Sequence, residues 1–330
     1  MNLMSLTLHH RLNQGVMKWT RLLPIVAMSL NVLLPGLAWT YEGLPDFTGQ
    51  QLAGKVKLKG KISAPKRFNL VLFSDPYYCG RISDGKGWRI SPMPALGESA
   101  ELSGAVVFLE KVKKGKLGTT TDTIIQTKNC VFFPYVSVTQ VGQTFHFQNW
   151  DPIEHKLEVL LTSQQGAQPL LGESLQPHPE NRKSDFLSAG QTGIHKAGPE
   201  ITYHPHKLGI LVFRCRLHDY MEGWSLVLPH PYFAITGKNG EFSLEDVPPG
   251  EYNLIVWHPL GQQKTIIEVG ARKTSSINIL ITPNSPTIYA EEEPTNNPFG
   301  IDLVGDSSIV PTVELQTWDS VSGSELGAGS

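Results

Sequence analysis

The chain has 330 residues, of which 40% are hydrophobic and 18% are charged, and its formal net charge is −2. This composition supplies enough apolar material for packed cores and excludes a largely disordered chain. A nucleic-acid-binding protein would need a strongly basic stripe, which so small a net charge does not provide. We therefore expect a globular protein of two modules with flexible ends and no nucleic-acid partner.

Residues 1–38 are predicted to be a signal peptide. Three basic residues flank an apolar run at 22–38, which contains Pro24 and Pro35. A basic flank followed by a short apolar run is typical of an export signal, and we place its cleavage near Ala38. An uncleaved membrane anchor is the alternative, although spanning a bilayer needs about 20 apolar residues. Both interpretations predict a periplasmic or extracellular protein, which touches a membrane only if the leader is retained.

The chain has three cysteines, Cys79, Cys130 and Cys215, so at least one has no partner within the chain. Cys215 is followed closely by a histidine and a methionine, whereas the other two stand in turn-like and β-rich surroundings. Exported proteins work in compartments where disulfides persist. We therefore predict a disulfide between Cys79 and Cys130 and a free Cys215.

Strand patterns dominate the chain after the leader. Runs rich in Val, Leu, Ile and Phe, bounded by Gly, Pro, Asn and Asp, favour β-strands at 54–62, 68–75, 103–112, within 122–161, at 208–215 and at 223–229. Residues 162–206 are rich in Gln, Gly, Pro, Ser and His and are predicted to form a long insertion without strands. These patterns predict an all-β fold.

A second module is expected from residue 231. Five short strand candidates follow one another at 232–236, 241–247, 251–258, 264–270 and 276–281, which predicts a small β-sandwich over 231–283. Residues 284–330 contain eight acidic residues and no Lys or Arg, and few of them are large and apolar. We interpret them as an acidic disordered tail.

The strongest chemical signal is the spacing Cys-x2-His-x2-Met at Cys215, His218 and Met221, between two predicted strands. Two histidines, a cysteine and a weak axial methionine form the donor set of electron-transfer copper sites. The second histidine must come from elsewhere, and His155, at another strand junction, is the best candidate. Zinc is the rival metal, but structural zinc sites close with Cys and His and do not call for methionine.

The run Phe-x-Cys-x-x-His-x-x-Met-x-Gly from Phe213 resembles the ligand loop of small cupredoxins of the plastocyanin and amicyanin type. The run FQNWDPIEH at 147–155 is similar to the first-ligand region of that family. This resemblance implies a Greek-key β-sandwich over 45–230, with the insertion at 162–206, and one type 1 (blue) copper. It implies His155, Cys215 and His218 as equatorial ligands and Met221 as the axial one.

Two positions depart from the family pattern. Lys156 stands where the family often has Asn, and Asp219 stands where it often has Pro. Neither change removes a ligand, but both affect hydrogen bonding around the thiolate, which tunes such sites. The second module, through its runs at 232–236, 239–242 and 247–252, resembles the transthyretin-like or carboxypeptidase-regulatory β-sandwich, which implies a rigid spacer or docking surface.

Taken together, these features predict a blue-copper carrier that passes on one electron, has no catalytic residues and works with a redox partner protein that the sequence does not name. One alternative is a copper oxidase or reductase with a second metal site in the insertion. Another is an envelope protein that stores or delivers copper. The insertion offers four histidines for the second site: His178, His195, His204 and His206.

Overall fold

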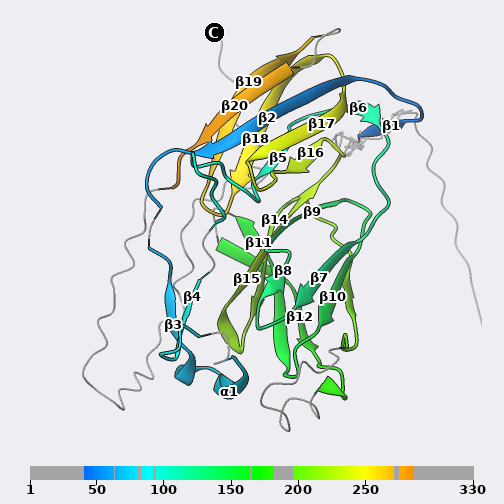
Figure 1. Cartoon of the computed structure of the whole chain (residues 1–330). Coiled ribbons are helices and arrows are strands. Elements are labelled where there is room, and N and C mark those ends of the chain that lie inside the picture. Colours follow the sequence, from blue (N-terminus) through cyan, green and yellow to red (C-terminus); the bar gives the residue numbers. More distant parts are fainter. Residues whose placement is uncertain are drawn as a thin grey trace, which may run out of the picture. The chain divides into compact units, whose positions relative to one another are not determined.

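The structure is a computed structural model that describes residues 41–62, 64–79, 83–91, 94–163, 166–181, 196–270 and 275–284. The predicted signal peptide and all but the first residue of the predicted tail lie outside this part. The regular secondary structure of the described residues is almost entirely β-strand, which confirms the all-β prediction (Figure 1). No helix among them is long and apolar enough to cross a membrane.

A first β-sandwich is built from two sheets. The five-stranded sheet has the order β12-β11-β14-β15-β9 and the four-stranded sheet the order β13-β10-β7-β8. Buried apolar side chains from both sheets form one core cluster, which includes Ile125, Phe147, Val159 and Phe213. The strands are β7 (Thr123–Thr127), β8 (Phe132–Phe133), β9 (Val136–Gln140), β10 (Phe145–Asn149), β11 (His155–Ser163), β12 (Gly166–Leu175), β13 (Ile201–Tyr203), β14 (Gly209–Cys215) and β15 (His218–Leu228).

A second β-sandwich pairs a four-stranded sheet, β16-β5-β18-β19, with a three-stranded sheet, β17-β2-β20. All five strand candidates after residue 231 are present. Two further strands, β2 and β5, come from the chain before the first sandwich and complete the second. The strands are β2 (Gln50–Leu58), β5 (Val106–Leu109), β16 (Phe233–Ile235), β17 (Glu241–Val247), β18 (Gly250–His258), β19 (Gly261–Val269) and β20 (Ser275–Ile281).

Strand pairing therefore divides the chain differently from the expected modules at 45–230 and 231–283. The first sandwich, residues 123–228, is inserted between β5 and β16 of the second one. The pairing of Leu52 with Ser275 illustrates why the sequence does not reveal this arrangement. Side-chain alternation reports which face of a strand is buried, but not which distant strand it pairs with.

Several strands at the centre of the molecule are buried on both faces. On β14, Leu211, Phe213 and Cys215 face the core of the first sandwich, whereas Ile210 and Val212 face the opposite side. There they join a third apolar cluster with residues of β5, β15 and β18, including Phe108, Trp224 and Trp257. Because side chains alternate along a strand, Cys215 is directed into the first core.

Residues 67–79 and 83–91, which we call the covering segment, lie between β2 and β5 in sequence but contribute to the core of the first sandwich. The segment contains β3 (Arg67–Asn69), a 3-10 turn (Leu70–Leu72), α1 (Pro76–Cys79) and β4 (Trp88–Ile90), and β3 pairs with β4. The strand predicted over 68–75 is wrong beyond Asn69, whose side chain accepts a hydrogen bond from the Val71 backbone N–H and caps the turn. Leu70 and Cys79 are buried in the first core.

The expectation of a strandless insertion at 162–206 is also wrong in part. β11 continues to Ser163 and pairs with the ten-residue strand β12, and β13 pairs with β10. Most side chains of β12 are exposed, so apolar and polar residues do not alternate along it as they do on a half-buried strand. Residues 182–195 lie outside the described part. Two remaining short strands, β1 (Glu42–Leu44) and β6 (Lys114–Lys116), pair in parallel.

Candidate metal centre

Three of the predicted donor residues lie at one end of three adjacent strands. His155 begins β11, Cys215 ends β14, and His218 begins β15. In the five-stranded sheet, Cys215 is opposite Leu157 on one side and opposite His218 on the other. Hydrogen bonding of the strands therefore places residues that are far apart in the sequence beside one another.

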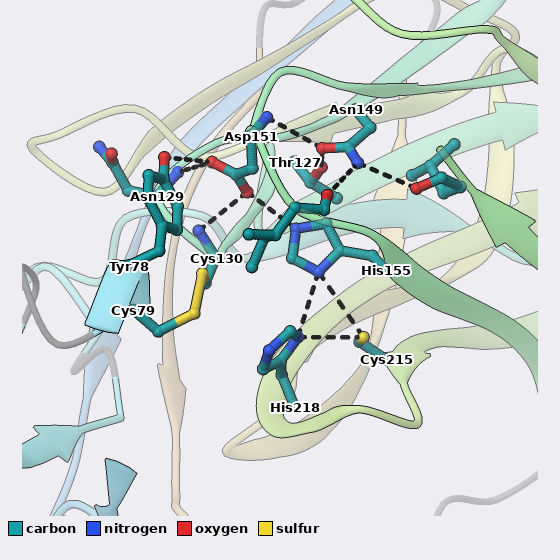
Figure 2. A network of polar contacts seen from close by, with 12 residues as sticks. Tyr78, Cys79, Thr127, Asn129, Cys130, Asn149, Asp151, His155, Cys215 and His218 are labelled. Atoms are coloured by element: carbon teal, nitrogen blue, oxygen red, sulfur yellow. Dashed lines mark hydrogen bonds and ion pairs between the residues drawn. A yellow bond between two sulfur atoms is a disulfide. The ribbon is translucent and has the colours of Figure 1, made fainter. Parts of the chain in front are cut away.

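The donor atoms of these residues converge on one buried point (Figure 2). The Cys215 Sγ lies 3.5 Å from the His218 Nδ1 and 3.7 Å from the His155 Nδ1, and the two nitrogens are 3.2 Å apart. The two histidines are fully buried, and Cys215 is 1% exposed. One thiol and two imidazoles in this arrangement can hold a metal ion.

The outer nitrogen of each imidazole has a partner of its own. His218 Nε2 lies 3.0 Å from the backbone oxygen of Ser74, and His155 Nε2 lies 2.9 Å from the Asp151 Oδ2. A carbonyl oxygen only accepts hydrogen bonds, so His218 donates through Nε2, and its neutral form has a lone pair on Nδ1. Partners of this kind fix the ring orientation of metal-binding histidines.

Asp151 is completely buried and accepts several hydrogen bonds besides that of His155. Tyr78 Oη donates to its Oδ1 over 3.0 Å, and the backbone N–H groups of Asn129 and Cys130 donate over 2.5 and 3.0 Å. Burial opposes ionisation, but the hydrogen bonds from His155, Cys130 and Tyr78 hold the pKa of Asp151 below its usual value. Asp151 is therefore an anion inside the protein.

The sequence does not reveal this role of Asp151. The dipeptide Asp151-Pro152 has the ordinary composition of a turn and indicates nothing more. Its position four residues before His155, in a turn between two strands, is the only local signal, and it gains meaning only once His155 is accepted as a ligand.

The site changes the protonation of its own donors. Burial alone would raise the pKa of the Cys215 thiol, but hydrogen bonds from His155 and His218 lower it to about 6. Burial alone would lower the pKa of His155, but hydrogen bonds with Asp151 and Cys215 raise it to about 9. The surroundings thus favour the thiolate, the form of cysteine that binds metals.

Met221 is 1% exposed and belongs to the same core cluster as Cys215. Its neighbour Tyr220 packs against the His218 ring at 5.6 Å and under the Arg89 guanidinium at 4.7 Å. The loop thus places Met221 inside the same core as Cys215, shortly after His218 in sequence. Its axial role stays a prediction.

The predicted disulfide between Cys79 and Cys130 is confirmed, and it links α1 of the covering segment to the turn before β8. Cys130 also belongs to a second group of close potential ligands, with Asp151 and His155. Because its sulfur is engaged in the disulfide, it offers no thiolate to a metal. Cys215 is a free, buried cysteine.

Two described histidines of the insertion, His178 and His204, contact residues outside the candidate metal centre. The His178 Nδ1 accepts a hydrogen bond from the Glu180 backbone N–H, and the His204 Nδ1 lies 3.0 Å from the Thr144 Oγ1. Within the ranges that the structure describes, neither these two nor His206 belongs to a group of three potential metal ligands. His195 lies outside those ranges.

No protein-family model matches the chain, and no curated protein matches it. Among solved structures, a reduced and an oxidised mutant of amicyanin are each 14% identical to it, with a TM-score of 0.23, over 33% of this chain and 84% of amicyanin. A copper-containing nitrite reductase from Thermus scotoductus SA-01 is 22% identical, with a TM-score of 0.23, over 34% of this chain and 23% of the reductase. Similarities at this level assign no function, so the geometry must support any proposal.

Proposed function

We propose that this protein binds one copper ion through His155, Cys215, His218 and Met221 and acts as an exported one-electron carrier. The observation that carries the proposal is the convergence of two imidazole Nδ1 atoms and one thiol sulfur at a buried point. This donor set, with a weak axial methionine, is the one used by electron-transfer copper proteins.

The protonation of His218 and of Cys215 fits a copper ion. His218 keeps its proton on Nε2 because the Ser74 oxygen accepts there, which leaves Nδ1 free to act as a ligand. The pKa of Cys215, lowered to about 6, makes it a thiolate at neutral pH. The donor group found here has three members, and the fourth ligand we propose, Met221, offers a thioether, which suits copper better than zinc.

Bound copper would supply reversible one-electron chemistry. The residues of this chain would hold His155, Cys215 and His218 in one arrangement, because each of the three stands at the end of a hydrogen-bonded strand and each outer imidazole nitrogen is fixed by a partner. Complete burial keeps bulk water away from the donors. Little side-chain movement would then accompany a change of oxidation state.

Export and an unidentified redox partner protein belong to the same proposal. The Cys79–Cys130 disulfide supports export, since structural disulfides persist in oxidising compartments and are rare in the cytosol. The predicted leader agrees with this location.

The absorption spectrum of the copper-loaded protein tests the proposal. We expect intense visible absorption from charge transfer between thiolate and copper. Cys215→Ser should abolish it, and the exposed control His206→Ala should leave it unchanged, because this histidine lies outside the ligand cluster. A wild-type protein that is fully loaded with copper yet colourless would overturn the proposal.

Counting metals separates a carrier from a copper oxidoreductase. We expect one copper per chain by elemental analysis. A second copper that is lost when His204 and His206 are both changed to Ala would instead favour the enzyme.

A further inference from the structure

We propose that Asp151 is a positioning residue that fixes the proton of His155 on Nε2 and thereby controls how this histidine binds the metal. This inference rests on the proposed function, because it assigns a task to a residue outside the ligand set. The Asp151 Oδ2 and the His155 Nε2 are 2.9 Å apart, and both side chains are completely buried.

The direction of this hydrogen bond follows from the other partners of the carboxylate. The backbone N–H groups of Asn129 and Cys130 can only donate, and Tyr78 Oη donates as well. A carboxylate that receives these bonds is ionised and acts only as an acceptor. The remaining bond must therefore be a donation from His155 Nε2, so its neutral ring has a lone pair on Nδ1, the atom that faces Cys215 (Figure 2).

The carboxylate stands on a turn that is itself held in place. The Asn149 side chain donates to the backbone oxygens of Ile153 and Leu175 over 2.7 and 2.9 Å. Its oxygen accepts from the Asp151 backbone N–H and from Thr127 Oγ1, each over 2.9 Å. Every polar atom of this amide thus has a partner, and the bond to the Asp151 backbone N–H holds the main chain of Asp151 in place beside His155.

A negative charge behind the imidazole makes it a more basic ligand, which favours the oxidised metal over the reduced one. The substitution Asp151→Asn removes this charge. It also allows the amide N–H to donate to His155 Nε2, which moves the histidine proton to Nδ1, where it blocks the metal. We expect a loss of copper affinity of roughly 10- to 100-fold and a higher midpoint potential.

The experiment compares wild type with Asp151→Asn. Nitrogen-15 NMR of the metal-free proteins at about pH 10, where histidine is neutral, reports which ring nitrogen has the proton. We expect Nε2–H for His155 in wild type and a shift toward Nδ1–H in the variant, together with the changes in affinity and midpoint potential. The exposed control Asp46→Asn, which removes the same charge outside the ligand cluster, should leave all three readouts unchanged.

An unchanged tautomer with unchanged affinity and potential in a folded Asp151→Asn protein would overturn the inference. If that variant does not fold, Tyr78→Phe removes one donor from the carboxylate and so leaves more of its negative charge for His155. It should keep Nε2–H and lower the midpoint potential. An unchanged or higher potential in Tyr78→Phe would overturn the inference too. A wild type that binds no copper but keeps Nε2–H would remove the proposed function while the positioning of His155 stands.

Discussion

At Cys215, burial and hydrogen bonding act on the thiol in opposite directions. Burial disfavours the thiolate, but the hydrogen bonds from His155 and His218 outweigh it, and the pKa falls from 9.0 to about 6. Because the pKa in the folded protein lies below that of the unfolded chain, the thiolate contributes stability above the unfolded pKa. This contribution is lost as the pH falls through about 6.

A titration of the metal-free protein tests this balance. The ultraviolet absorbance of the thiolate should rise with a midpoint near pH 6, and Cys215 alone contributes because Cys79 and Cys130 form a disulfide. His155→Gln should move the midpoint upward, since the variant has no imidazole to stabilise the anion. The matched control His206→Gln should not move it. A wild-type midpoint above about 8.5 would contradict the prediction.

Among the elements, the covering segment supports both histidines of the site. Its Ser74 accepts the hydrogen bond of His218, and its Tyr78 donates to Asp151, the partner of His155. The Cys79–Cys130 disulfide fastens the segment to the first sandwich. One element that belongs in sequence to the second sandwich thus holds the outer partners of the metal centre.

Removal of the disulfide should weaken both the fold and the site. The two cysteines are separated by 51 residues, and closing a loop of that length stabilises a protein by about 4 kcal/mol in the chain-entropy account. We expect the free energy of unfolding in urea to fall by about this much in the double variant Cys79→Ala, Cys130→Ala, and we expect the variant to bind copper less tightly than wild type. Val71→Ser, on the exposed side of the same segment, serves as the control. A double variant with the stability and the copper affinity of wild type would contradict this account.

Prediction from sequence succeeded where the signal was local. Alternation and turn residues located the strands from β16 to β20, and cysteine parity together with the residues that follow Cys215 gave the disulfide. The spacing of Cys215 and His218 pointed to a cluster that the structure brings together with His155. It failed where the signal was absent. The exposed β12 has no alternation, and Asp151 gains its role only from contacts with residues that fold onto it from elsewhere.

At the scale of the whole molecule, the two sandwiches are not separable at residue 231. The second one needs β2 and β5, which precede the first in sequence, and the third apolar cluster lies between the five-stranded sheet and the sheet of β5 and β18. Either sandwich alone would therefore expose apolar surface or lack strands.

Fragments of the chain provide the test. We expect residues 231–284 to be unfolded by NMR, because β16, β17, β18 and β20 lose the neighbours with which they pair. Residues 41–284 should give the dispersed spectrum of a folded β-protein. A dispersed β-type spectrum for the shorter fragment would show that its strands form a module without β2 and β5.

The pairing of β2 with β17 and β20 also sets an order of events during synthesis. Leu52, Val56 and Leu58 emerge early, yet the strands that cover them are made only after the entire first sandwich. Contacts between such distant segments form slowly, and an apolar strand that waits for its partners is prone to aggregation. The inserted sandwich can fold first. The strand β2 completes its pairing with β20 only after Ile281 has been synthesised, and until then its apolar side chains can contact other chains.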